Sequence, residues 1–177
     1  LLLKNRFEQL TKGYDNLSIK AQLIKCNEDI ATANEIFGDR IFSQQLLEKL
    51  GVNNHYQHFF IRRYFRIAWV YKYFLLDDNI KSFLYLGNTL PKSFQGDGFR
   101  KDILEEMFNF LVKKNRKKHL FDQEEKPFVV IDSDQFDEKK AGFITDLTKG
   151  KKRFIISTYQ TLGAGQNLQY SAPINLK

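Results

Sequence analysis

Apolar side chains recur at helical spacing through the first part of the chain. Residues 40–50 show this spacing between Asp39, a good N-terminal cap, and Gly51, a good C-terminal stop, so we predict a helix there. One or two further helices are predicted within residues 16–37. Residues 55–76 mix many aromatic residues with arginines and a lysine. We predict a mostly buried helix with its basic groups reaching solvent; base stacking beside phosphate contacts is the alternative.

The second half of the chain alternates between short apolar runs and amphipathic stretches. The runs at residues 80–86, 128–131 and 153–157 are rich in β-branched and aromatic residues and are predicted to be strands. Between them, residues 101–115 and 136–148 have the apolar stripe of a helix. A strand, helix, strand, helix, strand order is typical of a parallel sheet built from right-handed crossovers.

These patterns divide the chain into two parts. Residues 1–78 are predicted to form an all-helical segment, and residues 79–177 the first half of an α/β domain. The sequence of 177 residues begins with Leu1 rather than methionine and ends soon after the third predicted strand. We therefore expect it to be a fragment of a longer protein.

Charge and cysteine content narrow the choice of partner and compartment. The 28 lysines and arginines exceed the 21 acidic residues and give a net charge of +7, which favours a polyanionic partner such as nucleic acid; a solubilising surface is the simpler alternative. Cys26 is the only cysteine, so an internal disulfide is excluded and a reducing, cytoplasmic location is expected. The basic residues within 59–76 exclude a membrane-spanning helix there.

Small polar residues follow each predicted strand. They are Gly87, Asn88 and Thr89 after the first, Asp132, Ser133 and Asp134 after the second, and Ser157 and Thr158 at the end of the third. The carboxyl ends of parallel strands meet at one edge of a sheet, which is where open α/β sheets bind ligands. Hydroxyls and backbone amides exposed by glycine can approach a phosphate closely there.

The last of these stretches resembles a known motif. Residues 153–170 read as an apolar strand, Ser157 and Thr158, and then a glycine-rich segment, and this order resembles motif V of superfamily-two helicases and translocases of the Swi/Snf and restriction types. The glycine-rich segment carries Gly163, Gly165, Asn167, Leu168 and Gln169 at the matching offsets. Residues 80–170 as a whole resemble the second RecA-like lobe of these motors, a partial P-loop NTPase-type domain, from motif IV to motif V.

The resemblance assigns roles to individual residues. It implies contacts with the nucleic-acid backbone for Gly87, Asn88, Thr89, Ser133, Lys140, Ser157 and Thr158, and contacts with the nucleotide between the lobes for Gly163, Gly165 and Asn167. Ser133 and Lys140 depart from the glycine and arginine that are usual in the family. The alternative for the motif V residues is a purely structural loop with capped amides.

The family's catalytic parts are missing from this sequence. No Gly-x-x-x-x-Gly-Lys-Ser/Thr loop is present to hold ATP phosphates, and the arginine-containing motif VI is absent as well. We therefore predict no catalytic residue and no metal site in this chain, and expect ATP and Mg²⁺ to bind only the intact helicase. The expected partners are nucleic acid, DNA rather than RNA, and the missing first RecA-like lobe, with no membrane.

Two other functions fit parts of the sequence. Asp132 and Asp134 follow an apolar strand in residues 128–134, as in the opening motif of haloacid-dehalogenase-type phosphotransferases or in a Walker B strand, although capping of the next helix is the simpler role. A basic helical adaptor, in which residues 1–78 bind nucleic acid or protein, is the non-enzymatic alternative.

Overall fold

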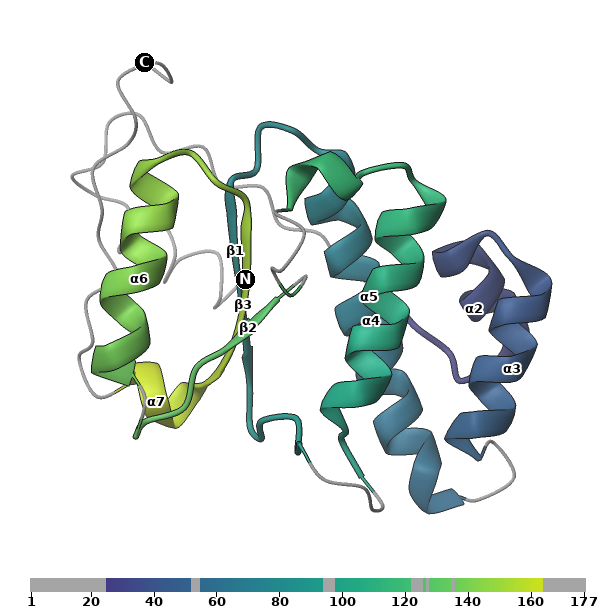
Figure 1. The fold of residues 1–177 in the computed structure, drawn as a ribbon. Helices are drawn as coiled ribbons and strands as arrows, with labels where there is room; N and C mark the ends of the chain where they lie inside the picture. The colour runs from purple at the N-terminus through teal and green to yellow at the C-terminus, as the bar shows by residue number, and fades with distance from the viewer. Residues whose placement is uncertain are drawn as a thin grey trace, which may run out of the picture.

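Three parallel strands form the centre of the fold in the computed structural model (Figure 1). The structure describes residues 25–51, 55–93, 98–121, 126, 128–134 and 136–163. Strands β1 (Ser82–Gly87), β2 (Val129–Val130) and β3 (Arg153–Thr158) lie in the order β1-β3-β2. The α/β class and the parallel sheet predicted from the sequence are therefore confirmed, although β2 is shorter than its apolar run.

The two connecting helices cover opposite faces of the sheet (Figure 1). Helix α5 (Lys101–Lys114) leads from β1 to β2, and α6 (Phe136–Thr148) leads from β2 back to β3. The first crossover leads from β1 to β2 and leaves a gap between them, and the second leads back from β2 to β3, which fills that gap. Two crossovers of the same hand in opposite directions place their helices on opposite faces, as observed here.

Helix α4 (His55–Leu76) packs beside α5 on one face of the sheet, and α2 (Ile30–Phe37) and α3 (Arg40–Leu50) lie outside it (Figure 1). A short connection joins α4 to β1, so the two run antiparallel and the N-terminal half of α4 lies near the carboxyl end of β1. The bounds of α4 confirm the helix predicted for this aromatic stretch. Among the described helices, none is long and apolar enough to cross a bilayer.

Helix α3 begins and ends at the residues predicted from the sequence. The Asp39 carboxylate accepts a hydrogen bond from the Phe42 backbone N–H at 3.0 Å, and this bond lowers the pKa of Asp39. Gly51 closes the helix in the left-handed conformation, with φ of 69°, which glycine adopts without a Cβ clash. Local signals were therefore sufficient to set both ends of this helix.

Side chains of β3 alternate between two cores. Phe154 and Ile156 pack against α4 and α5, whereas Ile155 packs with Phe143 and Leu147 of α6. All six residues of β3 are buried, as expected for the central strand of a sheet covered on both faces. The same large core also takes in side chains from α2 and α3, so the helical part and the sheet are held together by continuous packing.

Tyr71 of α4 carries a buried hydroxyl that has no hydrogen-bond partner within the described residues. Its side chain is 0% exposed, its ring stacks on Phe108 with centroids 3.8 Å apart, and burial raises its pKa. We expect Tyr71→Phe to keep the stacked ring and to raise the free energy of unfolding by about 1 kcal/mol, because an unpaired buried hydroxyl is costly. Urea denaturation followed by circular dichroism measures this change.

Tyr64, on the same helix, is the matched control. Its hydroxyl accepts a bond from the Arg100 backbone N–H at 2.5 Å and lies 3.2 Å from the Gly98 carbonyl oxygen, and burial raises its pKa to about 12. Tyr64→Phe should therefore lower the free energy of unfolding by about 1 kcal/mol. Equal losses in both variants would show that the Tyr71 hydroxyl is also bonded.

Candidate functional site

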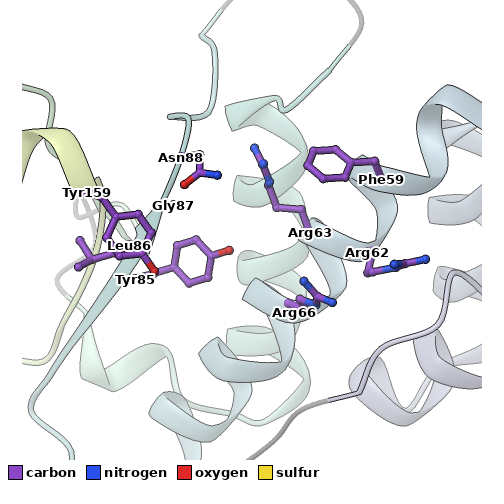
Figure 2. A pocket seen from close by; sticks show the side chains of 9 residues that line it. All are labelled: Phe59, Arg62, Arg63, Arg66, Tyr85, Leu86, Gly87, Asn88 and Tyr159. Atoms are coloured by element: carbon purple, nitrogen blue, oxygen red, sulfur yellow. The ribbon is translucent and has the colours of Figure 1, made fainter. Parts of the chain in front are cut away.

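A pocket of about 320 Å³ opens between α4 and the carboxyl end of β1 (Figure 2). Helix α4 contributes Phe59, Arg62, Arg63 and Arg66, strand β1 and its exit contribute Tyr85, Leu86, Gly87 and Asn88, and the short helix α7 (Tyr159–Gly163) contributes Tyr159. The lining therefore combines three arginines with three aromatic rings at the edge of the sheet where parallel α/β folds bind ligands.

The position of the three arginines follows from the direction and spacing of α4. Residues three and four apart share one side of a helix, and Arg63 and Arg62 precede Arg66 by three and four residues, so the three arginines form a single basic flank. Large apolar residues on the other side of α4 are buried in the core and fix the rotation of the helix. With α4 antiparallel to β1, this basic flank meets the end of the strand.

Arg63 is held in place by several contacts. Its Nη1 donates a hydrogen bond to the Thr89 hydroxyl just beyond β1. Its guanidinium also lies 4.8 Å from the centroid of the Phe59 ring and 5.2 Å from that of Phe99, within the range of cation–π attraction. The guanidinium is thus positioned before any ligand binds.

The pocket has a net positive charge. Arg62 forms an ion pair with Glu28, which compensates one of the three arginines. Within the described parts of the chain, neither Arg63 nor Arg66 forms an ion pair with a carboxylate. Arginines without a carboxylate partner beside a pocket favour an anionic ligand, because the guanidinium fork matches the oxygens of phosphate esters.

Tyr85 lies between the strand and the arginines. Figure 2 shows its ring directed from β1 toward α4. Burial raises the pKa of the Tyr85 phenol, while the positive charges of Arg63 and Arg66 oppose that rise. The phenol is therefore a neutral hydrogen-bonding group at physiological pH, next to the two cations.

The structure brings together several residues that the sequence nominated for the nucleic-acid backbone. Gly87 and Asn88 line the pocket, and Thr89 borders it through its bond to Arg63. Gly87 also pairs directly with Thr158 across the sheet. The ends of β1 and β3 therefore share one edge, as predicted.

Ser157 and Thr158 use their hydroxyls within the protein. Ser157 Oγ donates to the Ile131 carbonyl oxygen at 2.8 Å, which joins β3 to the end of β2. Thr158 Oγ1 accepts from the Thr161 backbone N–H at 3.1 Å and lies 2.9 Å from the Thr161 hydroxyl, so it caps α7. Both side chains are buried, and their contact with a phosphate stays a prediction.

The other nominated residues lie apart from the pocket or outside the described residues. Ser133 is exposed beyond β2, and its hydroxyl lies 3.4 Å from Asp134 Oδ1. Lys140 is on α6, across the sheet from the arginines, with its ammonium 5.5 Å from the Phe136 ring centroid. Gly163 ends α7. Gly165 and Asn167 lie outside the described residues.

Other chemistries would require a metal site, the carboxylates of Asp132 and Asp134, or the thiol of Cys26. No group of three or more histidine, cysteine or acidic residues that could hold a metal ion is found in the described residues. Asp132 and Asp134 follow β2, and their proposed roles in phosphoryl transfer or in capping stay predictions. Cys26 is a buried free thiol, and burial raises its pKa, so it remains protonated at neutral pH.

Comparison with known proteins assigns no family. No protein-family model matches the chain, and no curated protein matches its sequence. The resemblance to a helicase lobe therefore rests on the residues of motif V and on the order of the strands, and is a proposal below.

The arginines of the pocket lie on a helix that the sequence predicts, but the sequence does not predict that this helix packs beside the end of β1. The mixture of aromatic and basic residues in 55–76 was the available signal, and phosphate contact was one of its two interpretations. Phe59, Tyr85 and Tyr159 were not nominated as site residues, because nothing local to them indicates that they share a pocket.

Proposed function

We propose that this chain is part of the second RecA-like lobe of a superfamily-two, ATP-dependent nucleic-acid motor, and that the pocket between α4 and β1 binds the nucleic-acid backbone. The arginine-rich pocket at the carboxyl end of β1 is the observation that carries this proposal. The parallel sheet, with Gly87 beside Thr158 at the same edge, and the net charge of +7 support it.

Phosphate esters match the chemistry of this pocket. Arg63 and Arg66 would each donate paired hydrogen bonds to phosphate oxygens, and Asn88 would donate its side-chain amide. Such contacts hold the backbone without reading its sequence, as a motor that moves along a strand requires. DNA is the proposed partner rather than RNA.

In the intact protein, ATP and Mg²⁺ would bind between this lobe and a first lobe that carries the phosphate loop. Closure of the two lobes on ATP and reopening after hydrolysis would move the pocket along the strand. This chain by itself contributes contacts but no phosphate loop, so we expect no ATP hydrolysis from it alone. A cytoplasmic location is part of the same proposal.

Neutralising two arginines should weaken nucleic-acid binding. We expect the double variant Arg63→Gln/Arg66→Gln to bind a fluorescent DNA oligonucleotide about ten-fold to a hundred-fold more weakly, because two charge-assisted contacts are lost. The slope of log affinity against log salt should fall by about 1.4 on a single strand, since two phosphate contacts are removed. Fluorescence anisotropy over a salt series measures both quantities.

The double variant Lys113→Gln/Lys149→Gln is the matched control. It removes the same charge from exposed positions near the C-terminal ends of α5 and α6, away from the pocket. We expect it to leave the affinity within about two-fold, since isolated surface charges contribute little. Equal losses in the two variants, or salt-independent binding, would contradict a specific backbone site.

A further inference from the structure

The pocket ends at two exposed aromatic rings. Phe59 is 62% exposed and Tyr159 is 59% exposed, although both rings line the pocket. Figure 2 shows them on opposite sides, Tyr159 beside the end of β1 and Phe59 on α4, with Arg63 between them. Neither ring is buried by the fold, although Phe59 also contacts the Phe60 ring and the Arg63 guanidinium.

The size of the pocket limits what it can enclose. A cavity of about 320 Å³ lies at the small end of the range for small-molecule sites, which suits one unit of a chain ligand. A longer ligand held at the arginines would leave the pocket past Tyr159 on one side and past Phe59 on the other. Both rings are more than half exposed, so a flat group of such a ligand can reach each of them.

We infer that Tyr159 and Phe59 stack on unpaired bases, so that the pocket takes a single strand rather than a duplex. This inference rests on the proposed function, in which Arg63 and Arg66 hold the phosphates. Bases in a duplex are stacked on one another and their faces are not accessible, whereas a single strand offers a face at every base. Sites for single strands combine positive charge with aromatic rings on which bases stack, and here Arg63 supplies the charge and the two rings supply the stacking surfaces.

The two rings differ in how cleanly they can be tested. Phe59 also contacts the Arg63 guanidinium at 4.8 Å, so its replacement disturbs the phosphate contact as well. Tyr159 has no such contact with an arginine in the described residues. Tyr159→Leu is therefore the decisive variant, and Tyr73→Leu, an exposed tyrosine in the C-terminal half of α4, is its control.

The experiment compares three DNA probes of equal length with the full 177-residue chain. They are a single strand containing the fluorescent base 2-aminopurine, an abasic single strand, and a duplex. We expect the base-containing strand to bind about five-fold or more tightly than the abasic strand, with quenching of 2-aminopurine on stacking. Tyr159→Leu should remove most of that difference and most of the quenching, and Tyr73→Leu should change neither.

The possible results separate this inference from the proposed function. Equal, salt-dependent binding of the base-containing and abasic strands would overturn stacking and leave the phosphate site intact. Tighter binding of the duplex than of either single strand would also overturn it. Absence of salt-dependent binding to any of the three probes would remove the proposed function, and the inference with it.

Discussion

Phe154→Ala should lower the free energy of unfolding by about 3–5 kcal/mol, the cost of deleting a fully buried aromatic ring. Phe154 lies in the central strand and is almost completely buried. Its ring centroid is 5.1 Å from that of Tyr71, 5.3 Å from that of Phe83 and 5.5 Å from those of Phe74 and Phe108. Alanine would leave a cavity where α4, α5 and the sheet meet. Urea denaturation followed by circular dichroism measures the loss.

Leu84→Ala provides the comparison within the same sheet. Leu84 is on β1 and is 38% exposed, so its truncation removes less buried surface. We expect it to cost no more than about 1 kcal/mol. Similar costs for the two variants would show that the aromatic cluster around Phe154 is not the main core. Phe154→Leu should fall between them, because leucine fills part of the cavity.

Lys152→Met should lower the free energy of unfolding by about 2 kcal/mol. Lys152 is only 4% exposed, and its Nζ donates to the carbonyl oxygens of Phe74 at 2.5 Å and Asp77 at 2.6 Å. These bonds satisfy carbonyls at the C-terminal end of α4, where positive charge is also favourable. Burial lowers the pKa of Lys152, and this cost of desolvation offsets part of the gain. Thermal and urea unfolding measure the change.

Lys151→Met is the matched control for this lysine. Lys151 is adjacent in sequence, and its ammonium lies 3.8 Å from the Asp146 carboxylate in a partly exposed ion pair. Such pairs contribute about 0–1 kcal/mol, so the control should change stability little. A loss in Lys151→Met as large as in Lys152→Met would contradict a special role for the buried lysine.

Weaker DNA binding by Lys152→Met is also expected, since this lysine anchors the helix that carries the arginines.

Most of the helices and strands could be predicted from local pattern. Asp39 and Gly51 bracket α3, and the aromatic helix α4 has the bounds expected for it. Strand β2 is the main difference: four apolar residues predicted a strand of residues 128–131, but only Val129–Val130 pair with β3. The apolar pattern reports burial: Phe128 and Ile131 are buried on either side of the assigned strand, and Ile131 still donates its backbone N–H to the Ile156 carbonyl oxygen of β3 at 2.9 Å.

The candidate site was only partly accessible to sequence reasoning. The exit of β1, with Gly87 and Asn88, could be nominated because the carboxyl edge of a parallel sheet is a general ligand site. The hydroxyls of Ser157 and Thr158 were assigned outward roles, yet in the structure they bond to Ile131 and Thr161. Sequence gives the type of a polar group but not its hydrogen-bond partner, which depends on neighbouring elements.

The sequence by itself determined the alternation of helices and strands, the parallel sheet and the excess of positive charge, because these follow from spacing along the chain and from composition. Only the tertiary structure decided that Arg63 and Arg66 meet the end of β1 beside Tyr159. That meeting depends on the antiparallel packing of α4 on the sheet, which is fixed by contacts such as Tyr71 with Phe154 between residues far apart in the chain. Local pattern does not encode contacts of this kind.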